Sequence, residues 1–155
     1  MGSLEEKIKG IAKDVYGELG SGHSEAVYQK AMEVGLRLEH ISFESQKVIE
    51  LLYEAHYVGE EYLDLLVTAD SERLIVELKA VGSSISSPEE QQLRNYLNHL
   101  GIQKGLLINF PQPSASKKKA AEVGNVEPEF RTVRGKTAPD VSSQTDPKVP
   151  PRTVL

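Results

Sequence analysis

The sequence contains no cysteine, no apolar run long enough to cross a membrane, and no net positive charge. Without cysteine, the chain cannot form a disulfide or a zinc site built on thiolates. No stretch matches a transmembrane helix, and the first residues lack the apolar segment of a secretory signal. These absences predict a soluble intracellular protein, in the cytoplasm or the nucleus, with no membrane partner.

The charge balance is acidic, with 18 basic and 23 acidic side chains and a formal net charge of -5. A protein dedicated to nucleic acid usually carries a clear positive field, so this balance counts modestly against tight binding. The basic clusters, at 117–119 and 131–136, lie late in the chain. A phosphate-directed function would therefore depend on a local basic surface, on the C-terminal region or on metal ions.

The apolar pattern divides the chain into two parts. Apolar residues recur regularly from about residue 4 to about residue 110, and few large aliphatic residues follow Pro111. The later part is rich in Pro, Ser, Lys, Glu and Thr, which bury too little apolar surface to offset chain entropy. We expect one domain over residues 1–110, a last short strand over 128–134, and an otherwise largely disordered tail over 111–155.

Capping residues and apolar periodicity predict three helices. Ser3 followed by Glu6 forms a capping box, and the helix that it opens is expected to end at Gly20. A second helix is predicted from Ser24 to about Leu38, and a third from Ser87 to Leu100. The apolar face of the second helix is expected to contain Val27, Ala31, Val34 and Leu38.

Apolar segments between and after these helices predict strands. They cover residues 48–53, 57–67, 74–80 and 105–110. The last segment is nearly all apolar, which is typical of a strand inside a sheet. The order of elements predicts an α/β fold with a mixed central β-sheet flanked by helices.

Three charged residues interrupt two of these apolar strands. Asp64 lies in the earlier strand, and Glu77 and Lys79 lie in the later one. Because side chains alternate along a strand, Glu77 and Lys79 project from one face while the other face packs into the core. A hairpin through 68–73 would bring Asp64 near Glu77, although sequence leaves the register open. The alternative is a weak, solvated ion pair between Glu77 and Lys79.

This set of side chains suits the metal-assisted cleavage of a phosphodiester. Mg²⁺ prefers oxygen ligands and keeps several waters, so a few carboxylates suffice to hold it. A bound metal lowers the pKa of its water and stabilises charge on the phosphorus. Lys79 would act either as a base or through its charge, and the sequence leaves both roles open.

Several segments occur together in a fixed order before Pro111. They are Gly22 to Tyr28, which fits G-x-x-E-x-x-Y, the strand with Asp64, the segment 76–81, the helix with Gln92 to Leu97, and the strand 105–110. In this combination the chain resembles the PD-(D/E)XK nuclease superfamily and, within it, the GxxExxY proteins. The resemblance implies a restriction-endonuclease-like core and a Mg²⁺- or Mn²⁺-dependent nuclease that acts on nucleic acid, expected to be DNA.

The resemblance also implies residue roles in the strands. Asp64 and Glu77 look like the metal-binding carboxylates, and the backbone carbonyl of Leu78 would add a ligand. Lys79 resembles the lysine that assists the attacking water and offsets charge on the phosphate. Leu63 precedes Asp64, so the chain has no literal Pro-Asp.

Three helical residues match further positions of the family. Glu25 matches the glutamate of the first helix motif, as an extra metal ligand or a neighbour of the ligands. Gln92 and Tyr96 match residues of the helix after the Glu-x-Lys strand, and one helical turn separates them on a shared face. Glu25 as a simple first-turn acid and Tyr96 as a packing residue with a polar tip are the alternatives.

Two other functions are carried alongside the nuclease. One is a non-catalytic module that binds nucleic acid or protein on a nuclease fold, suggested by the acidic charge and the absence of a substrate-specificity domain. The other is a structural domain whose charges form surface pairs. A chain this small would need a homodimer or a partner to grip a duplex. Ala55 stands where relatives often have glycine, which leaves the geometry of that hairpin turn open.

Overall fold

The computed structural model describes residues 2–113 and 127–136. In chain order its elements are α1 (Leu4–Leu19), α2 (Glu25–Leu38), β1 (Ser42–Tyr53), β2 (His56–Ala69), β3 (Glu72–Lys79), α3 (Ser87–Leu100), β4 (Lys104–Asn109) and β5 (Glu129–Arg134). The predicted disorder of residues 114–126 and 137–155, with the lysine cluster at 117–119, lies outside the described residues.

Serine residues cap the three helices. The Ser3 hydroxyl accepts a hydrogen bond from the Glu6 amide at 3.2 Å at the start of α1. The Ser24 hydroxyl accepts one from the Val27 amide at 3.4 Å at the start of α2. The cap of α3 is Ser86 rather than Ser87, because the Ser86 amide donates to the Glu89 side chain at 2.8 Å and completes a capping box one residue earlier.

The five strands form one mixed sheet in the order β1-β2-β3-β4-β5. Only the β3–β4 pair is parallel among the described strands, and α3 supplies the crossover that a parallel pair requires. β5 pairs with β4 at the far edge, where Phe130 lies opposite Ile108. The predicted α/β class with a mixed sheet is therefore confirmed.

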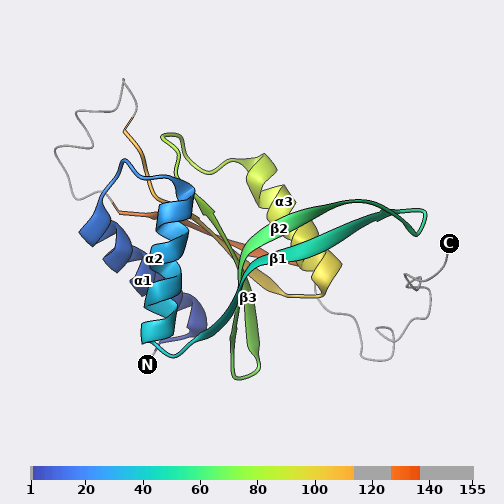
Figure 1. The fold of residues 1–155 in the computed structure, drawn as a ribbon, viewed down its shortest axis with the longest axis horizontal. Helices are drawn as coiled ribbons and strands as arrows, with labels where there is room; N and C mark the ends of the chain where they lie inside the picture. The colour runs from blue at the N-terminus through green and yellow to red at the C-terminus, as the bar shows by residue number, and fades with distance from the viewer. Residues whose placement is uncertain (1, 114–126, 137–155) are drawn as a thin grey trace.

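Helices cover both faces of the sheet (Figure 1). On one face, α1 and α2 enclose a core that includes alternate residues of β3, namely Leu74, Val76 and Leu78. On the other face, α3 packs over a second core around Ile75 and Leu107. The alternation predicted for β3 is correct, and it places Glu77 and Lys79 on the same face of the sheet as Ile75, the face that α3 covers.

The apolar face predicted for α2 is wrong. Tyr28, Met32 and Leu36, spaced four residues apart, are fully buried against α1 and the sheet. Val27, Val34 and Leu38 of the predicted face are instead 41%, 47% and 73% exposed. The helix carries two apolar stripes, and the one with the larger side chains is buried, with the Tyr28 ring stacked on Phe110 at 4.3 Å.

β1 is longer than predicted, and its outer half projects with β2 beyond the rest of the sheet (Figure 1). The first residues of β1 are mostly polar and were therefore not predicted as a strand, but Phe43 pairs with Val67 of β2. At the tip, Glu54 and Ala55 have φ of 49° and 65°, as a two-residue turn with the twist of a hairpin requires. Ala55 therefore adopts a backbone conformation that favours glycine.

Candidate functional site

Asp64 and Glu77 lie side by side on β2 and β3. Leu65 pairs with Val76, so Asp64 and Glu77 are the next positions along the two strands. The Asp64 amide donates to Oε2 of Glu77 at 2.9 Å, and the Leu78 amide donates to Oδ2 of Asp64 at 2.7 Å. Each carboxylate is thus held by the backbone of the other strand.

The two carboxylates disfavour one another's charge. Burial raises the pKa of Glu77 to about 8, and the neighbouring charge of Asp64 adds to the effect. Burial also raises the pKa of Asp64, although hydrogen bonds from Leu78 and Gln46 act in the opposite direction. The positive charge of Lys79 lowers the pKa of both groups without overcoming these effects. The pair would be stabilised by any additional cation.

Lys79 lies between these carboxylates and the start of α3. Its Nζ is 4.0 Å from Oε2 of Glu89, and the side chain is only partly exposed. The predicted alternative, an ion pair between Glu77 and Lys79, does not form among the described residues, because Glu77 is partly buried and the ion pair of Lys79 is with Glu89. Lys79 therefore lies near Asp64 and Glu77 but forms no ion pair with either of them.

The three site residues predicted on helices differ in burial and in their contacts with the site. Glu25 is exposed at the start of α2, and its charge contributes to the raised pKa of Glu77, whose first cause is burial. Tyr96 is buried under α3, and burial raises its pKa, followed by its hydrogen bond to Glu61 and the charges of Glu77 and Asp64. Gln92 is exposed on α3, and its side chain makes no hydrogen bond within the described part of the chain. Gln92 therefore has no side-chain hydrogen bond with Asp64, Glu77 or Lys79, and its predicted role beside the site stays a prediction.

A buried polar network behind Asp64 was not predicted from the sequence. Gln29 of α2 donates to the backbone oxygen of Asp64 at 3.0 Å and accepts from Gln46 at 2.8 Å. Gln46 also reaches Oδ1 of Asp64 at 3.2 Å. Ser45 donates to the buried carboxylate of Glu33 at 2.7 Å, which closes the network onto α2.

The signal for this network was the spacing of polar residues on α2. Glu25, Gln29 and Glu33 recur every four residues and so share one face of the helix. The contribution of β1 was harder to see, because Gln46 has a φ of 52° and is skipped in the pairing between Ser45 and Lys47. The register is the same on both sides of Gln46, so its left-handed backbone interrupts the pairing without a bulge, and its side chain reaches Asp64.

The donor set fits a hard divalent cation bound in part by water. Two partly buried carboxylates offer oxygen atoms, and their unfavourable proximity would be relieved by a cation between them. Among the described residues, no three Asp, Glu, His or Cys side chains are grouped closely enough to hold a metal together. Mg²⁺ commonly uses only one or two carboxylates, with waters and substrate phosphates completing its ligands.

Comparison with known proteins agrees with this architecture. The family model described as the PD-(D/E)XK nuclease superfamily matches residues 2–122. The solved structure titled "Crystal structure of SSO0001" is similar in fold, with a TM-score of 0.50 and 13% sequence identity. The likeness covers 74% of this chain and 52% of that one, so the chain spans about half the length of that protein.

No curated protein matched the sequence. No helix among the described residues has the length and apolar character needed to cross a bilayer. The five-stranded mixed sheet between α1–α2 and α3 is a restriction-endonuclease-like core, and the family model covers most of the chain, including all of that sheet except β5. The chain therefore belongs to the PD-(D/E)XK nuclease superfamily.

Proposed function

We propose that this protein is a divalent-metal-dependent nuclease of the GxxExxY group that hydrolyses phosphodiester bonds, with DNA as the expected substrate. The observation that carries the proposal is the interlocked pair of Asp64 and Glu77 with Lys79 beside it. Burial and mutual repulsion make this pair costly unless it serves a cation. Superfamily membership supports phosphodiester chemistry for such a site.

In this proposal the carboxylates of Asp64 and Glu77 hold Mg²⁺ or Mn²⁺, with the Leu78 carbonyl as a further ligand. A metal held there supplies Lewis-acid activation of water and charge stabilisation at phosphorus. Lys79 offsets charge on the scissile phosphate and orients the attacking water. Gln46 and Gln29 keep Asp64 in place through their hydrogen bonds to its side chain and backbone.

The helical residues have supporting roles in the proposal. Glu25 adds negative charge at the rim and attracts the metal. Tyr96 and Glu61 form a hydrogen-bonded pair that borders the carboxylates under α3. Gln92, exposed one turn before Tyr96, would meet the nucleic acid rather than the metal.

The test is cleavage of labelled single- and double-stranded DNA and RNA with Mg²⁺ or Mn²⁺. We expect Asp64→Asn and Lys79→Ala each to lower the rate of cleavage by at least about a hundredfold, in line with the loss of a group that acts on the reacting atoms. The exposed residues Asp14 and Lys13 provide matched controls. Asp14→Asn and Lys13→Ala should cleave at the wild-type rate. Wild-type activity in the Asp64 and Lys79 variants would refute the assignment.

The second candidate is a non-catalytic binding module on the same fold. The observation that favours it is that the amides of Leu78 and Asp64 already occupy an oxygen of each site carboxylate. Calorimetry with Mg²⁺ and Mn²⁺ separates the two candidates. Metal binding that disappears in Glu77→Gln supports the nuclease, whereas no binding at millimolar metal supports the module.

A further inference from the structure

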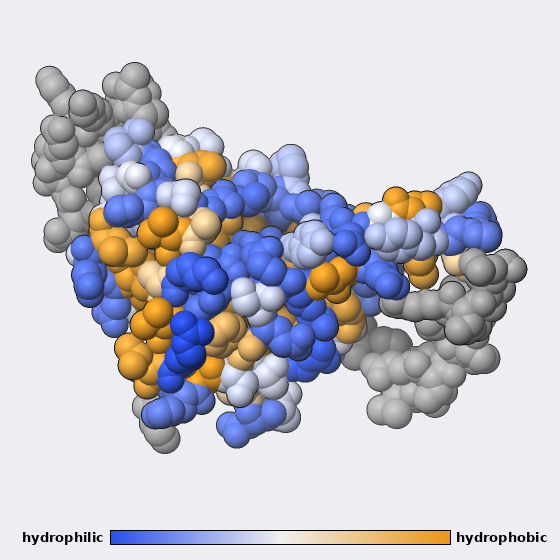
Figure 2. Space-filling view, in the orientation of Figure 1, coloured by the Kyte–Doolittle hydropathy of each residue, from blue (hydrophilic) through white to orange (hydrophobic). Residues whose placement is uncertain are grey.

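The exposed apolar stripe of α2 runs into a groove, which Val34 and Leu38 of the stripe help to line. Val27, Val34 and Leu38 follow spacings of seven and four residues along the helix, and all three are exposed. Single exposed aliphatic residues are common on proteins, but a row of them along one helix face is not. Apolar residues gather at the surface over α1 and α2 (Figure 2). The side chains of this stripe do not pack into the core of the protein.

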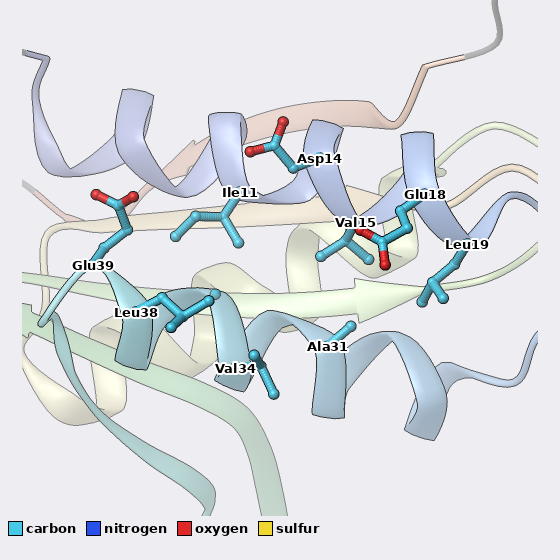
Figure 3. A pocket seen from close by; sticks show the side chains of 10 residues that line it. Ile11, Asp14, Val15, Glu18, Leu19, Ala31, Val34, Leu38 and Glu39 are labelled. Atoms are coloured by element: carbon cyan, nitrogen blue, oxygen red, sulfur yellow. The ribbon is translucent and has the colours of Figure 1, made fainter.

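The groove lies between α1 and α2 and has a volume of ≈ 350 Å³. Aliphatic side chains from both helices face one another across it: Ile11, Val15 and Leu19 from α1, and Ala31, Val34 and Leu38 from α2 (Figure 3). At 1.5 Å per residue, its α1 wall is about 12 Å long, or about two helical turns. Gly35 brings the two helices together at its floor, against the side chain of Ile11. The groove therefore has the shape and lining that would suit a further helix.

Every charged side chain that lines the groove in the described part of the chain is a carboxylate. These are Asp14, Glu18 and Glu39 (Figure 3). Two copies packed groove to groove would bring six carboxylates together, which disfavours a symmetric dimer through this surface. Phosphates of nucleic acids and of anionic lipids are disfavoured for the same reason. The charge pattern calls for an occupant with basic residues.

We propose that the groove between α1 and α2 docks an amphipathic helix of a partner protein that carries lysine or arginine beside its aliphatic stripe. The aliphatic stripe fills the groove, in the way that helices bind hydrophobic grooves elsewhere. The basic residues pair with Asp14, Glu18 and Glu39 at the rim. The groove lies on the α1–α2 side of the sheet, and Glu77 and Lys79 lie on the α3 side. α2 contacts the proposed site on its other face, where Gln29 donates to the backbone oxygen of Asp64.

A pair of synthetic helical peptides tests the proposal. Both have 18 residues and leucine at positions i, i+4, i+7 and i+11, but one has lysine and the other glutamate beside that stripe. Fluorescence anisotropy with the full chain should give binding of the lysine peptide and binding at least about tenfold weaker for the glutamate peptide. The Glu18→Lys variant should reverse part of this preference, because it changes the sign of one rim charge.

Polar substitutions locate the binding surface. Val34→Gln and Leu38→Gln should each weaken binding of the lysine peptide by about tenfold, because each removes apolar contact in the groove. Val48→Gln is the matched control, since Val48 is 45% exposed on β1 and lies outside the groove. Circular dichroism and thermal melts should be the same in all three variants, because all three positions are exposed.

Four outcomes would overturn the proposal. The first is equal binding of the two peptides, and the second is an equal loss of binding in Val48→Gln. The third is a dimer in analytical sedimentation that disappears in Leu38→Gln, which would show that a second copy of the chain occupies the groove. The fourth is peptide binding that appears only when residues 114–126 are replaced by a Gly-Ser linker. This would show that the lysine-containing segment of the chain itself occupies the groove.

Discussion

The substitution Glu77→Gln is expected to stabilise the metal-free protein in a way that depends on pH. The Glu77 carboxylate is buried beside Asp64, and burial together with that charge raises its pKa from 4.5 to about 8. Glutamine keeps an oxygen that can accept the hydrogen bond from the Asp64 amide but carries no charge. The substitution therefore removes the electrostatic cost and keeps the contact.

The sign and size follow from the linkage between protonation and folding. The folded state binds the Glu77 proton more tightly than the unfolded state, so the folded state loses stability as pH rises from about 4.5 to about 8. The loss is at most about 1.4 kcal/mol per pH unit. Between pH 5 and pH 8 this gives about 2 to 4 kcal/mol, with the lower figure allowing for partial solvation of the side chain.

Urea unfolding in the presence of EDTA at pH 5, 6, 7 and 8 measures this effect. The free energy of unfolding of Glu77→Gln minus that of the wild type should be near zero at pH 5 and should grow toward pH 8. Titration of the four histidines cancels in this difference. Glu18→Gln, an exposed glutamate on α1, should show no such growth. A difference between Glu77→Gln and wild type that stays constant with pH would refute the buried, charge-coupled carboxylate.

Three further predictions concern other parts of the molecule. Gln46→Ala should weaken Mn²⁺ binding in calorimetry by about tenfold or more, because it removes an amide that holds a site carboxylate. Ala55→Gly should stabilise the protein to thermal unfolding by about 1 kcal/mol, since glycine adopts the φ of 65° without strain. Gly35→Ala should destabilise by about 1–3 kcal/mol through a clash with Ile11, whereas Gly10→Ala, with open space around it, should stabilise by up to about 1 kcal/mol.

The ends of α1 and α3 were predictable because local chemistry sets them. Ser3 and Gly20 delimit α1 as their side-chain and backbone preferences require. The start of α3 was displaced by one residue, because two serines in succession offer equivalent caps and only the partner glutamate distinguishes them. Glu89 bonds to Ser86, three residues before it. The capping pattern therefore predicted the helix α3, but its first residue depended on which serine pairs with Glu89.

The burial of α2 could not be predicted from its own sequence. Two stripes of comparable apolar character run along the helix, and which of them faces inward depends on what α1 and the sheet present. Phe110, at the end of β4, offers a flat ring to Tyr28, and this long-range contact selects the stripe that contains Tyr28. Periodicity alone contains no information about such a contact.

The candidate site was predictable in part. The hairpin between β2 and β3 brings Asp64 opposite Glu77 by strand geometry, and alternation places Lys79 on the same face as Glu77. Gln46 precedes the predicted strand 48–53, and its φ of 52° interrupts the pairing of β1 with β2, so no strand pattern indicated its contact with Asp64. Gln92, predicted beside the site from its place on the helix, has an exposed side chain, and its role stays a prediction.

Three features that are unfavourable in isolation lie around Asp64. Gln46 adopts a left-handed backbone conformation, Glu33 is a buried carboxylate, and Glu77 is buried next to Asp64. Each of these features is unfavourable for folding when taken alone. Gln29 donates to Glu33 and to the backbone oxygen of Asp64 and accepts from Gln46, so the first two features are joined to Asp64. Proteins tolerate unfavourable backbone conformations and buried charges mainly at functional sites. The grouping of these features around Asp64 therefore supports a functional site there.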